Sequence, residues 1–434
     1  MSGIRSLVES HRRATVVSIA AVGLLLHFGF FLAAGDQHQR WDSAQYLAGA
    51  HSLAAGHGFT IDGQIEARRT PGYPLFLVPF LAAGLGPVSV VVAQHVIAVA
   101  LALALFFMTE ALTGDALAAA IAELFVAVDS GQIYLANLVM TETLMSVLLV
   151  AALFALVRWH ATRNPRWAAA GGALVAASVL VRPVAVYLWI PLVLWIALFR
   201  PHGRRFAAAA LFLACAASLP MLWMWRNSVR AGTASLSSIE GEDLYYWRAA
   251  GAVAMHRSGF EYSILPFGGE ENFRYQFFRV VQHEFVDAAD KAMRARFGAR
   301  AATLSEAQRS AFAAELARRV FLRYPGALVL VTINGALHLL FDSTWMVPDI
   351  LFGGFLHDAA IVLLVLSAVA SFLLAVTGFL RLQRTNPGLA WLLAVVLVYF
   401  VAVSSGPEYE QWRYRVPLIP LEGILVAANV LRLR

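Results

Sequence analysis

Two acidic side chains lie where they could act on a substrate at a membrane surface. Asp42 belongs to the polar segment 35–69, and Glu142 lies at the start of the apolar stretch 141–160. A carboxylate can take a proton from a hydroxyl group, and ionisable groups at the edge of the lipid are costly and tend to face a cavity. The two residues therefore predict acid–base chemistry at one face of a membrane.

Arginines are expected on the same face as these two acids. Arginine suits the binding of phosphate, because its planar guanidinium group offers paired donors. The candidates for holding a phosphate are Arg69, Arg68, Arg413 and Arg415. Further residues that we expect to line the pocket are Tyr46, Tyr73, Arg182, His95, Tyr409 and Glu410. Together these side chains suit an attack on a phosphate-linked substrate that is held in lipid.

A simpler interpretation of Asp42 competes with this one. Five residues share one face at helical spacing, namely Trp41, Asp42, Gln45, Tyr46 and Gly49. They predict an amphipathic helix on the outer membrane surface, from which Leu47 can face lipid. On such a helix Asp42 would simply be solvated. The presence of Glu142 and several arginines on the same face favours a chemical role.

The composition identifies the environment of these residues. The 434 residues are 60% hydrophobic and 14% charged, whereas soluble domains carry roughly 25% charged residues. The net charge of +6 comes largely from arginines in short loops, without a basic domain that would bind nucleic acid. Cys215 is the only cysteine, which excludes disulfides and cysteine-based zinc sites. No motif predicts a cofactor or a metal site, and a requirement for a divalent cation stays open.

About ten membrane spans are predicted, since one span needs about 20 mainly apolar residues. They cover about 14–34, 88–112, 116–134, 141–160, 167–181, 184–199, 206–225, 356–380, 389–404 and 413–431. Arginines gather in alternate loops, and such loops face the cytoplasm. This rule puts both termini in the cytoplasm and the candidate site outside. The first span is expected to be a retained signal anchor.

Three regions follow from this topology. Residues 1–225 form an N-terminal transmembrane module, whose first outer loop, 35–87, carries the catalytic candidate Asp42. Residues 226–325 form a mainly helical extracytoplasmic insertion. Residues 326–434 form a C-terminal transmembrane module, which begins with a re-entrant or surface segment, 326–355.

Within the insertion, a helix is predicted to begin at a capping box made by Thr303 and Glu306. After it, Phe312, Leu316 and Val320 recur at helical spacing and should pack against neighbouring helices. The acidic run 240–243 is predicted to be a solvated surface.

Four short motifs resemble those of a known family when they are taken in order. They are Trp-Asp-Ser-Ala-Gln-Tyr at 41–46, Arg-Thr-Pro-Gly-Tyr-Pro at 69–74, Thr-Glu-Thr-Leu at 141–144 and Arg-Tyr-Arg-Val-Pro at 413–417. The family is that of the GT-C membrane glycosyltransferases that use polyprenyl-phosphate sugars. The resemblance is to the bacterial branch of this family, which is glycosyltransferase family 39-like and is related to the protein O-mannosyltransferases and the lipid A aminoarabinose transferase. The resemblance implies a GT-C-like bundle with surface helices in the first outer loop.

The resemblance also implies roles for the candidate residues. Asp42 would activate the acceptor, and Glu142 would be the second acid, which places or activates the acceptor. The arginines, with Arg69 first, would hold the donor phosphate. The expected reaction moves a sugar from a polyprenyl-phosphate donor to a hydroxyl of a lipid, glycan or protein acceptor, with inversion. A bacterial inner membrane is the expected location.

Two other functions remain open. A lipid or polysaccharide transporter would have the same composition, and Glu123, which lies well inside a predicted span, supports this alternative. No internal repeat, which many transporters have, is visible. An O-antigen ligase or polymerase would also join sugars on the outer face, but from a diphosphate lipid donor. The early position of Asp42 favours the class that uses monophosphate donors.

Overall fold

Helices make up most of this computed structural model, which describes residues 2–199, 205–258, 273–341, 346–407 and 411–431. Six described helices are long and apolar enough to cross a membrane: α2 (Arg12–Ala34), α5 (Pro87–Thr113), α8 (Glu142–Thr162), α11 (Arg205–Arg230), α18 (Gly354–Thr385) and α19 (Pro387–Ser404). Two bent pairs raise the number to eight if each is one span: α6 (Ala116–Ala127) with α7 (Ser130–Ala136), and α15 (Glu306–Arg323) with α16 (Pro325–Phe341). The predicted helical membrane fold is therefore confirmed, whereas the count of ten spans is not.

Shorter helices occupy the remaining predicted spans. α9 (Pro165–Val181) is followed by the single turn η1 (Pro183–Ala185) and by α10 (Trp189–Leu198). The last predicted span is divided into four pieces, α20 (Trp412–Arg415), η5 (Val416–Leu418), α21 (Ile419–Ala427) and η6 (Ala428–Val430). Pro417 and Pro420 lie among these pieces, and proline removes a backbone donor from a helix.

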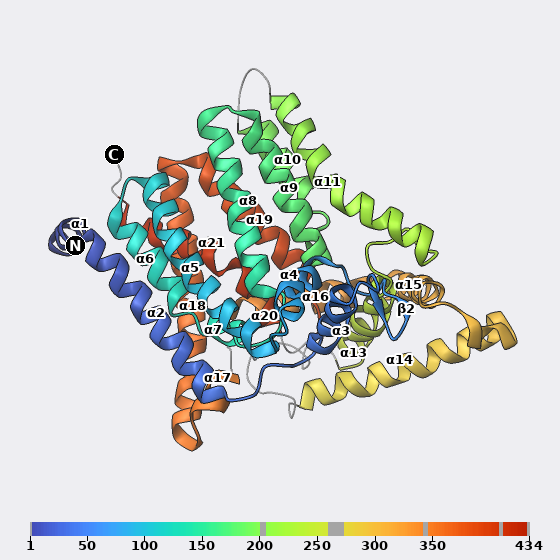
Figure 1. The fold of residues 1–434 in the computed structure, drawn as a ribbon. Helices are drawn as coiled ribbons and strands as arrows, with labels where there is room; N and C mark the ends of the chain where they lie inside the picture. Colours follow the sequence, from blue (N-terminus) through green and yellow to red (C-terminus); the bar gives the residue numbers. More distant parts are fainter. Residues whose placement is uncertain (1, 200–204, 259–272, 342–345, 408–410, 432–434) are drawn as a thin grey trace.

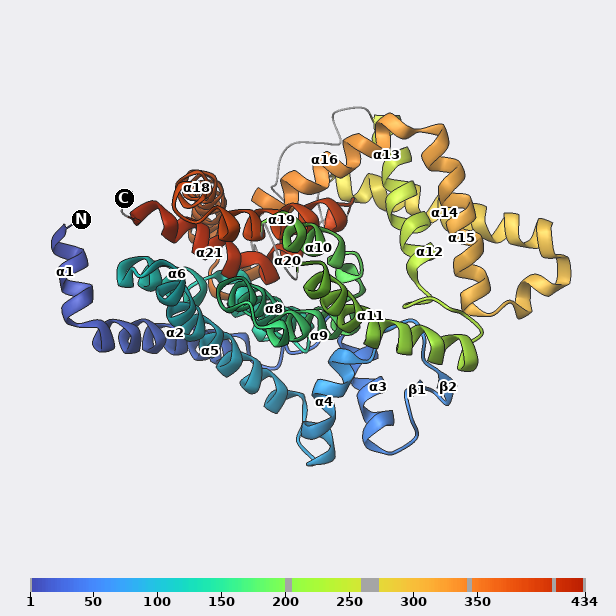
Figure 2. The same cartoon turned by 90° about the horizontal axis from the view of Figure 1, so that it is seen from above.

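The apolar helices lie side by side as a bundle (Figure 1). α9 packs against α8 and α11, while α6 packs against α5 and α21. Seen from above, α8 and α9 lie between the side formed by α2 and α5 and the side formed by α18 and α19 (Figure 2). α21 is buried from Ile419 to Leu425, which fits a helix that is apolar nearly all round.

Ion pairs and hydrogen bonds of two arginines connect the helices at one end of the bundle. Arg5, in α1 (Ser2–Ser10), forms an ion pair with Asp115 and donates a hydrogen bond to the carbonyl of Val430 at 2.6 Å. Arg12 binds Glu110 in the last turns of α5, with 2.7 Å between Nε and Oε1. These contacts join the start of the chain, the α5–α6 turn and the last described helix. This is the end that we predict to be cytoplasmic.

The first outer loop folds against the opposite end of the bundle. It contains α3 (Ser43–Ala54), the two-stranded hairpin of β1 (Thr60–Ile61) and β2 (Gln64–Ile65), and α4 (Gly72–Ala82). The hairpin is antiparallel, and Thr60 is opposite Ile65. α3 packs against α4 and buries both Tyr46 and Leu47 in the main core. The prediction that Leu47 faces lipid is therefore wrong, because α3 has a packing partner on that side.

The insertion builds a second apolar core beside the bundle. Its helices are α12 (Glu240–Glu242), the π-helix η2 (Asp243–Ala249), α13 (Ala250–Ser258), α14 (Phe273–Phe297), η4 (Gly298–Thr303) and α15. Tyr245, Val253, Phe285 and Phe312 are among the buried residues of this core. Leu316 and Val320 pack against it, as the helical spacing predicts.

The start of α15 differs from the prediction. Ser305 caps the helix, and Ser305 and Gln308 form the capping box. Thr303 instead ends η4, where its hydroxyl donates to the carbonyl of Arg300 at 3.1 Å. After α15 the chain bends by 102° into α16, and α17 (Met346–Leu351) follows. We predict that segment 326–355 is re-entrant or lies on the membrane surface, and this stays a prediction.

Candidate active site

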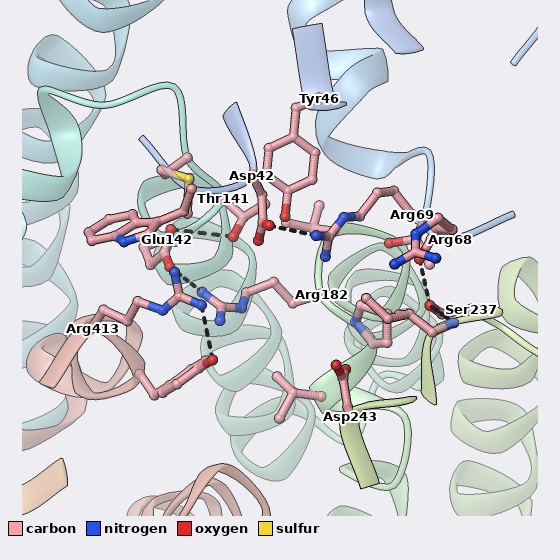
Figure 3. Close-up of a pocket in the computed structure, with 18 of the residues that line it drawn as sticks. Asp42, Tyr46, Arg68, Arg69, Thr141, Glu142, Arg182, Ser237, Asp243 and Arg413 are labelled. Atoms are coloured by element: carbon pink, nitrogen blue, oxygen red, sulfur yellow. Dashed lines mark hydrogen bonds and ion pairs between the residues drawn. The ribbon is translucent and has the colours of Figure 1, made fainter. Parts of the chain in front are cut away.

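A cavity of about 530 Å³ opens where the first outer loop meets the end of the bundle. Its walls come from the start of α8, the break between α9 and η1, the start of the insertion, and α20 (Figure 3). Seven of the predicted site residues line it: Asp42, Tyr46, Arg68, Arg69, Glu142, Arg182 and Arg413. The structure therefore brings together residues that lie up to 371 positions apart, from 42 to 413.

Asp42 is held by an arginine of the same loop. Arg69 donates from Nη2 to Asp42 Oδ1 at 2.5 Å, and from Nε to the amide oxygen of Gln45 at 2.7 Å. The residue before Asp42, Trp41, has a φ of +50°, a left-handed conformation that costs energy in a residue other than glycine. The side chain of Asp42 is 25% exposed, so a substrate can reach it.

Backbone contacts hold this loop beside the start of α8. The carbonyl of His38 accepts a hydrogen bond from the amide of Val139 at 2.9 Å. The side-chain amide of Asn137 donates to the carbonyl of Gln37 at 3.3 Å. Asp42 consequently lies at the same cavity as the first residue of α8, Glu142.

Glu142 forms a buried ion pair with Arg182. The side chain of Glu142 is fully buried, and Arg182 Nη1 donates to its Oε1 at 2.5 Å. The hydroxyl of Thr141 donates to the other carboxylate oxygen at 3.3 Å. Arg182 has an extended backbone, with a φ of −142°, because Pro183 disfavours the helical conformation in the residue before it. The break between α9 and η1 thus aims an arginine at Glu142.

A close backbone contact explains the glycine of the Arg-Thr-Pro-Gly-Tyr-Pro motif. A Cβ atom on Gly72 would lie 2.6 Å from the backbone carbonyl of Leu180, which is too close for any other residue. α4 therefore begins directly against the end of α9. This contact keeps the loop of Arg69 beside Arg182.

Aromatic rings support the arginines on the far side of the cavity. The guanidinium of Arg413 lies 5.2 Å from the ring centre of Trp41 and 4.9 Å from that of Tyr414. Arg182 lies over the same tyrosine ring, at 5.0 Å. Arginine stacks well on aromatic faces. Trp41 and Tyr414 belong to the quoted motifs, yet their supporting role was not predicted.

Arg68 joins the cavity to the insertion. It pairs with Glu242 at 3.2 Å and with Glu306 at 3.6 Å. Its carbonyl accepts a hydrogen bond from the hydroxyl of Ser237 at 2.5 Å. Its charge is therefore partly balanced by carboxylates of the insertion.

Arg415 does not line this cavity, contrary to the prediction. It is bound to Glu422 by two hydrogen bonds, at 2.6 and 3.0 Å. Arg415 follows Arg413 by two residues, which is roughly 200° further round a helix, so the two arginines face different sides. The motif alone could not separate them.

Tyr73 and His95 are fully buried behind the site. Tyr73 donates to the side chain of Gln94 at 2.7 Å, and its ring lies 5.1 Å from that of Tyr46. His95 pairs with His27 at 2.8 Å. Neither residue lines the cavity, contrary to the prediction, because both are packed in the core behind it. Tyr409 and Glu410 lie outside the described residues.

The insertion supplies a wall of the cavity that the sequence did not reveal. Glu240, Asp243 and Trp247 line the cavity, so the acidic run 240–243 is not simply a solvated surface. Glu240 is exposed at the edge of the cavity, and partial loss of its hydration there raises the pKa of its carboxyl. Burial, with Asp42 nearby, also raises the pKa of Tyr46 to about 12. The hydroxyl of Tyr46 is therefore neutral at ordinary pH.

Part of the chain matches a known family. Residues 69–225 match the family model of the dolichyl-phosphate-mannose-protein mannosyltransferases. This part contains Arg69, Glu142 and Arg182, but neither Asp42 nor Arg413. The match confirms the predicted resemblance to glycosyltransferases that use polyprenyl-phosphate sugars. The comparison with curated proteins yields no match.

Two solved structures match this chain over nearly its whole length at low sequence identity. The oligosaccharyltransferase AglB from Archaeoglobus fulgidus, in complex with an inhibitory peptide and a dolichol-phosphate, is 13% identical, with a TM-score of 0.49 over 96% of this chain and 50% of that one. ArnT from Cupriavidus metallidurans, bound to undecaprenyl phosphate, is 17% identical, with a TM-score of 0.42 over 95% of this chain and 78% of that one. The chain thus spans half the length of the AglB chain.

Proposed function

We propose that the protein transfers a sugar from a polyprenyl-phosphate donor to a hydroxyl group of an acceptor. The observation that supports this most strongly is the cavity in which an accessible carboxylate, Asp42, lies among the arginines Arg69, Arg182 and Arg413. The family match over residues 69–225 supports the same class of donor.

The reaction is a displacement at the anomeric carbon of the donor sugar. The acceptor oxygen forms a bond to this carbon while the bond from the carbon to the phosphate oxygen breaks. Asp42 takes the proton of the acceptor hydroxyl. The polyprenyl phosphate leaves with its electron pair, and the arginines stabilise the charge that grows on it. A single displacement inverts the configuration of the anomeric carbon.

The contacts favour Asp42 over Glu142 as the base. The side chain of Asp42 is 25% exposed, whereas that of Glu142 is fully buried and tied to Arg182. Glu142 holds Arg182 in place and balances its charge until the phosphate arrives. Glu142 thus serves the acceptor step indirectly, through the arginine that it positions.

The arginines have different amounts of binding capacity left for a phosphate. Nη2 and Nε of Arg69 are used by Asp42 and Gln45, and among the described residues its Nη1 makes no hydrogen bond. Arg182 uses its Nη1 for Glu142. Arg69 and Arg182 therefore both keep donors that can turn to a phosphate, and their pairing with carboxylates fixes their direction.

The acceptor approaches from a neighbouring cavity. This second cavity, of about 610 Å³, is lined by Gln45, the β1–β2 hairpin and the start of α15, and it shares Arg68 with the first. Gln45 is bonded to the same arginine that holds Asp42. A polar acceptor in this cavity would reach Asp42 from the side opposite Arg413. The acceptor is a lipid, a glycan or a protein.

The site faces the outside of the cell in this proposal. The end of the bundle with Arg5 and Arg12 would face the cytoplasm, since arginine-rich loops stay on that side. The donor tail would lie between the apolar helices, and the membrane would be the inner membrane of a bacterium.

The test uses the purified protein with labelled undecaprenyl-phosphate sugars and a membrane glycolipid extract as acceptor. Wild-type protein should release undecaprenyl phosphate and label the extract, and Asp42→Asn should do neither. Asp36→Asn, which changes an exposed acid six residues earlier in the loop, serves as the matched control. Full turnover by Asp42→Asn would exclude the proposed base. Turnover with undecaprenyl-diphosphate sugars alone would instead favour the ligase alternative.

A further inference from the structure

We propose that the insertion recognises the sugar of the donor through the wall formed by residues 237–247. In this proposal the carboxylates of Glu240 and Asp243 accept hydrogen bonds from sugar hydroxyls, and Trp247 packs against the sugar ring. The inference rests on the proposed function, because it assumes that the donor phosphate is bound by the arginines.

The two sides of the cavity carry opposite charge. Arg182 and Arg413 come from the bundle, while Glu240 and Asp243 come from the insertion. Figure 3 shows Asp243 at the cavity, apart from the group formed by Asp42 and Arg69. A phosphate is attracted to the arginine side and repelled by the carboxylates. The group attached to that phosphate therefore extends toward the insertion.

The chemistry of the wall fits a sugar. An ionised carboxylate only accepts hydrogen bonds, and sugar hydroxyls donate them. Trp247 adds a large flat apolar surface with a single donor group, which suits the C–H face of a sugar ring. Glu240 and Asp243 are three residues apart, and Trp247 follows Asp243 by four. At helical spacing, the three side chains point to one side of the segment.

The backbone that carries Asp243 and Trp247 has a rare helical form. Asp243–Ala249 form a π-helix of seven residues, and π-helices are rare and often found at functional sites. The wider turn keeps Asp243 and Trp247 on the same side. Tyr245, in contrast, is buried in the core of the insertion. The segment thus faces the cavity on one side and its own core on the other.

Hydrogen bonds fix the wall to both neighbours. The amide of Ser238 donates to the carbonyl of Ala67 at 2.8 Å, next to the arginines of the first loop. The amide of Gly241 donates to the hydroxyl of Ser310 in α15 at 2.9 Å. A side chain on Gly241 would overlap the backbone of Ser310. A wall held this firmly can select among sugars, because it cannot retreat from a poor fit.

The experiment separates binding of the phosphate from binding of the sugar. The full-length protein in detergent is titrated with undecaprenyl phosphate and, separately, with a panel of undecaprenyl-phosphate hexoses and pentoses. For each sugar, we compare the affinity for the undecaprenyl-phosphate sugar with the affinity for undecaprenyl phosphate, and the ratio of the two is the preference for that sugar. The variants are Asp243→Asn, Glu240→Gln and the milder Trp247→Phe. Glu315→Gln is the matched control, because Glu315 lies on the outer side of the insertion in contact with Arg296 and Arg319.

In wild-type protein at least one sugar should bind more tightly than the bare phosphate. Asp243→Asn and Glu240→Gln should lower this preference by about tenfold, the order expected for a lost hydrogen bond to a charged group. Affinity for undecaprenyl phosphate should be unchanged or higher, which also shows that the variants are folded. Trp247→Phe should alter the ranking of the sugars, and Glu315→Gln should change nothing.

Two results would overturn the inference in different ways. If wild-type protein does not bind undecaprenyl phosphate at all, the proposed function fails and the inference fails with it. If the phosphate binds but the variants keep the wild-type preference for the sugar, only the inference fails.

Discussion

Arg69 and Asp42 form an ion pair at 2.5 Å inside the candidate site. Arg69 also bonds Gln45 on the next turn of α3, so the arginine fixes both the position and the direction of the carboxylate. Neither side chain is fully buried, at 20% and 25% exposed. The pair is therefore accessible to a substrate, and it places the proposed general base beside an arginine that is proposed to bind the donor phosphate.

Replacing Arg69 by lysine should show whether activity depends on the positive charge of this residue or on its paired hydrogen bonds to Asp42 and Gln45. Lysine keeps the positive charge but cannot bond Asp42 and Gln45 through a rigid fork. We expect turnover to fall by about 10²-fold or more, the size seen when one stabilising donor is lost, while the protein stays folded. The loss of activity is measured as turnover of undecaprenyl-phosphate sugar, and the intact fold is checked with a thermal unfolding scan. Wild-type turnover in Arg69→Lys would show that only the charge matters.

The pair of Glu142 and Arg182 should matter for stability as well as activity. Removing one partner leaves a buried charge without compensation, which costs about 3–5 kcal/mol. Glu142→Gln should therefore lower the midpoint of thermal unfolding clearly. The double variant Glu142→Gln with Arg182→Gln should recover part of this loss, although it stays inactive. A double variant that is as unstable as the sum of the single variants would contradict the coupling.

Local patterns in the sequence predicted much of this site because several pocket residues belong to short motifs. Arg69 and Gly72 stand in one motif, and Glu142 opens a helix whose first residue could be predicted. The sequence could not show that Arg415 turns to Glu422, since that depends on how α20 sits against α21. Nor could it show that Glu240 and Asp243 face a cavity, because that surface forms only when the insertion packs against the first loop.

The same limit applies to the fold. The apolar stretches predicted the long helices well, since a span of lipid imposes their length. The division of the last span into short pieces and the burial of Leu47 depend on neighbouring helices. Tertiary contacts of this kind leave little local signal.

Glu240→Gln should make the protein more stable and less selective. Glu240 stays exposed to solvent, but the protein around it excludes part of its water and raises the pKa of Glu240 in the folded protein above its value in the unfolded chain. Because solvent screens an exposed group, the effect on stability should be small. The charged form is thus disfavoured by folding, and stability is lost as the pH rises from the unfolded pKa through the folded one. The variant should unfold at a higher temperature than wild type at neutral pH, and this gain should vanish in acid, below the unfolded pKa. An equal gain at both pH values would mean that ionisation of Glu240 is not the cause.

Glu123 offers a way to separate transfer from transport. Its side chain is fully buried in α6, and neither carboxylate oxygen has a hydrogen-bond partner among the described residues. Burying a polar group without a partner costs about 1–3 kcal/mol, so Glu123→Met, which has a similar length, should raise the unfolding temperature. Sugar transfer should stay at the wild-type level, because Glu123 does not line the candidate site.

A transporter would behave in the opposite way. An ionisable residue inside a span often carries a proton or ion along the transport path, so Glu123→Met would then abolish function despite its greater stability. Unfolding temperature and transfer of labelled sugar are measured on the same preparations of Glu123→Met and wild type. Greater stability with unchanged transfer would show that sugar transfer does not need Glu123, and the proposed chemistry would stay with Asp42. Loss of transfer in a stabilised variant would instead require a functional role for the interior of the bundle.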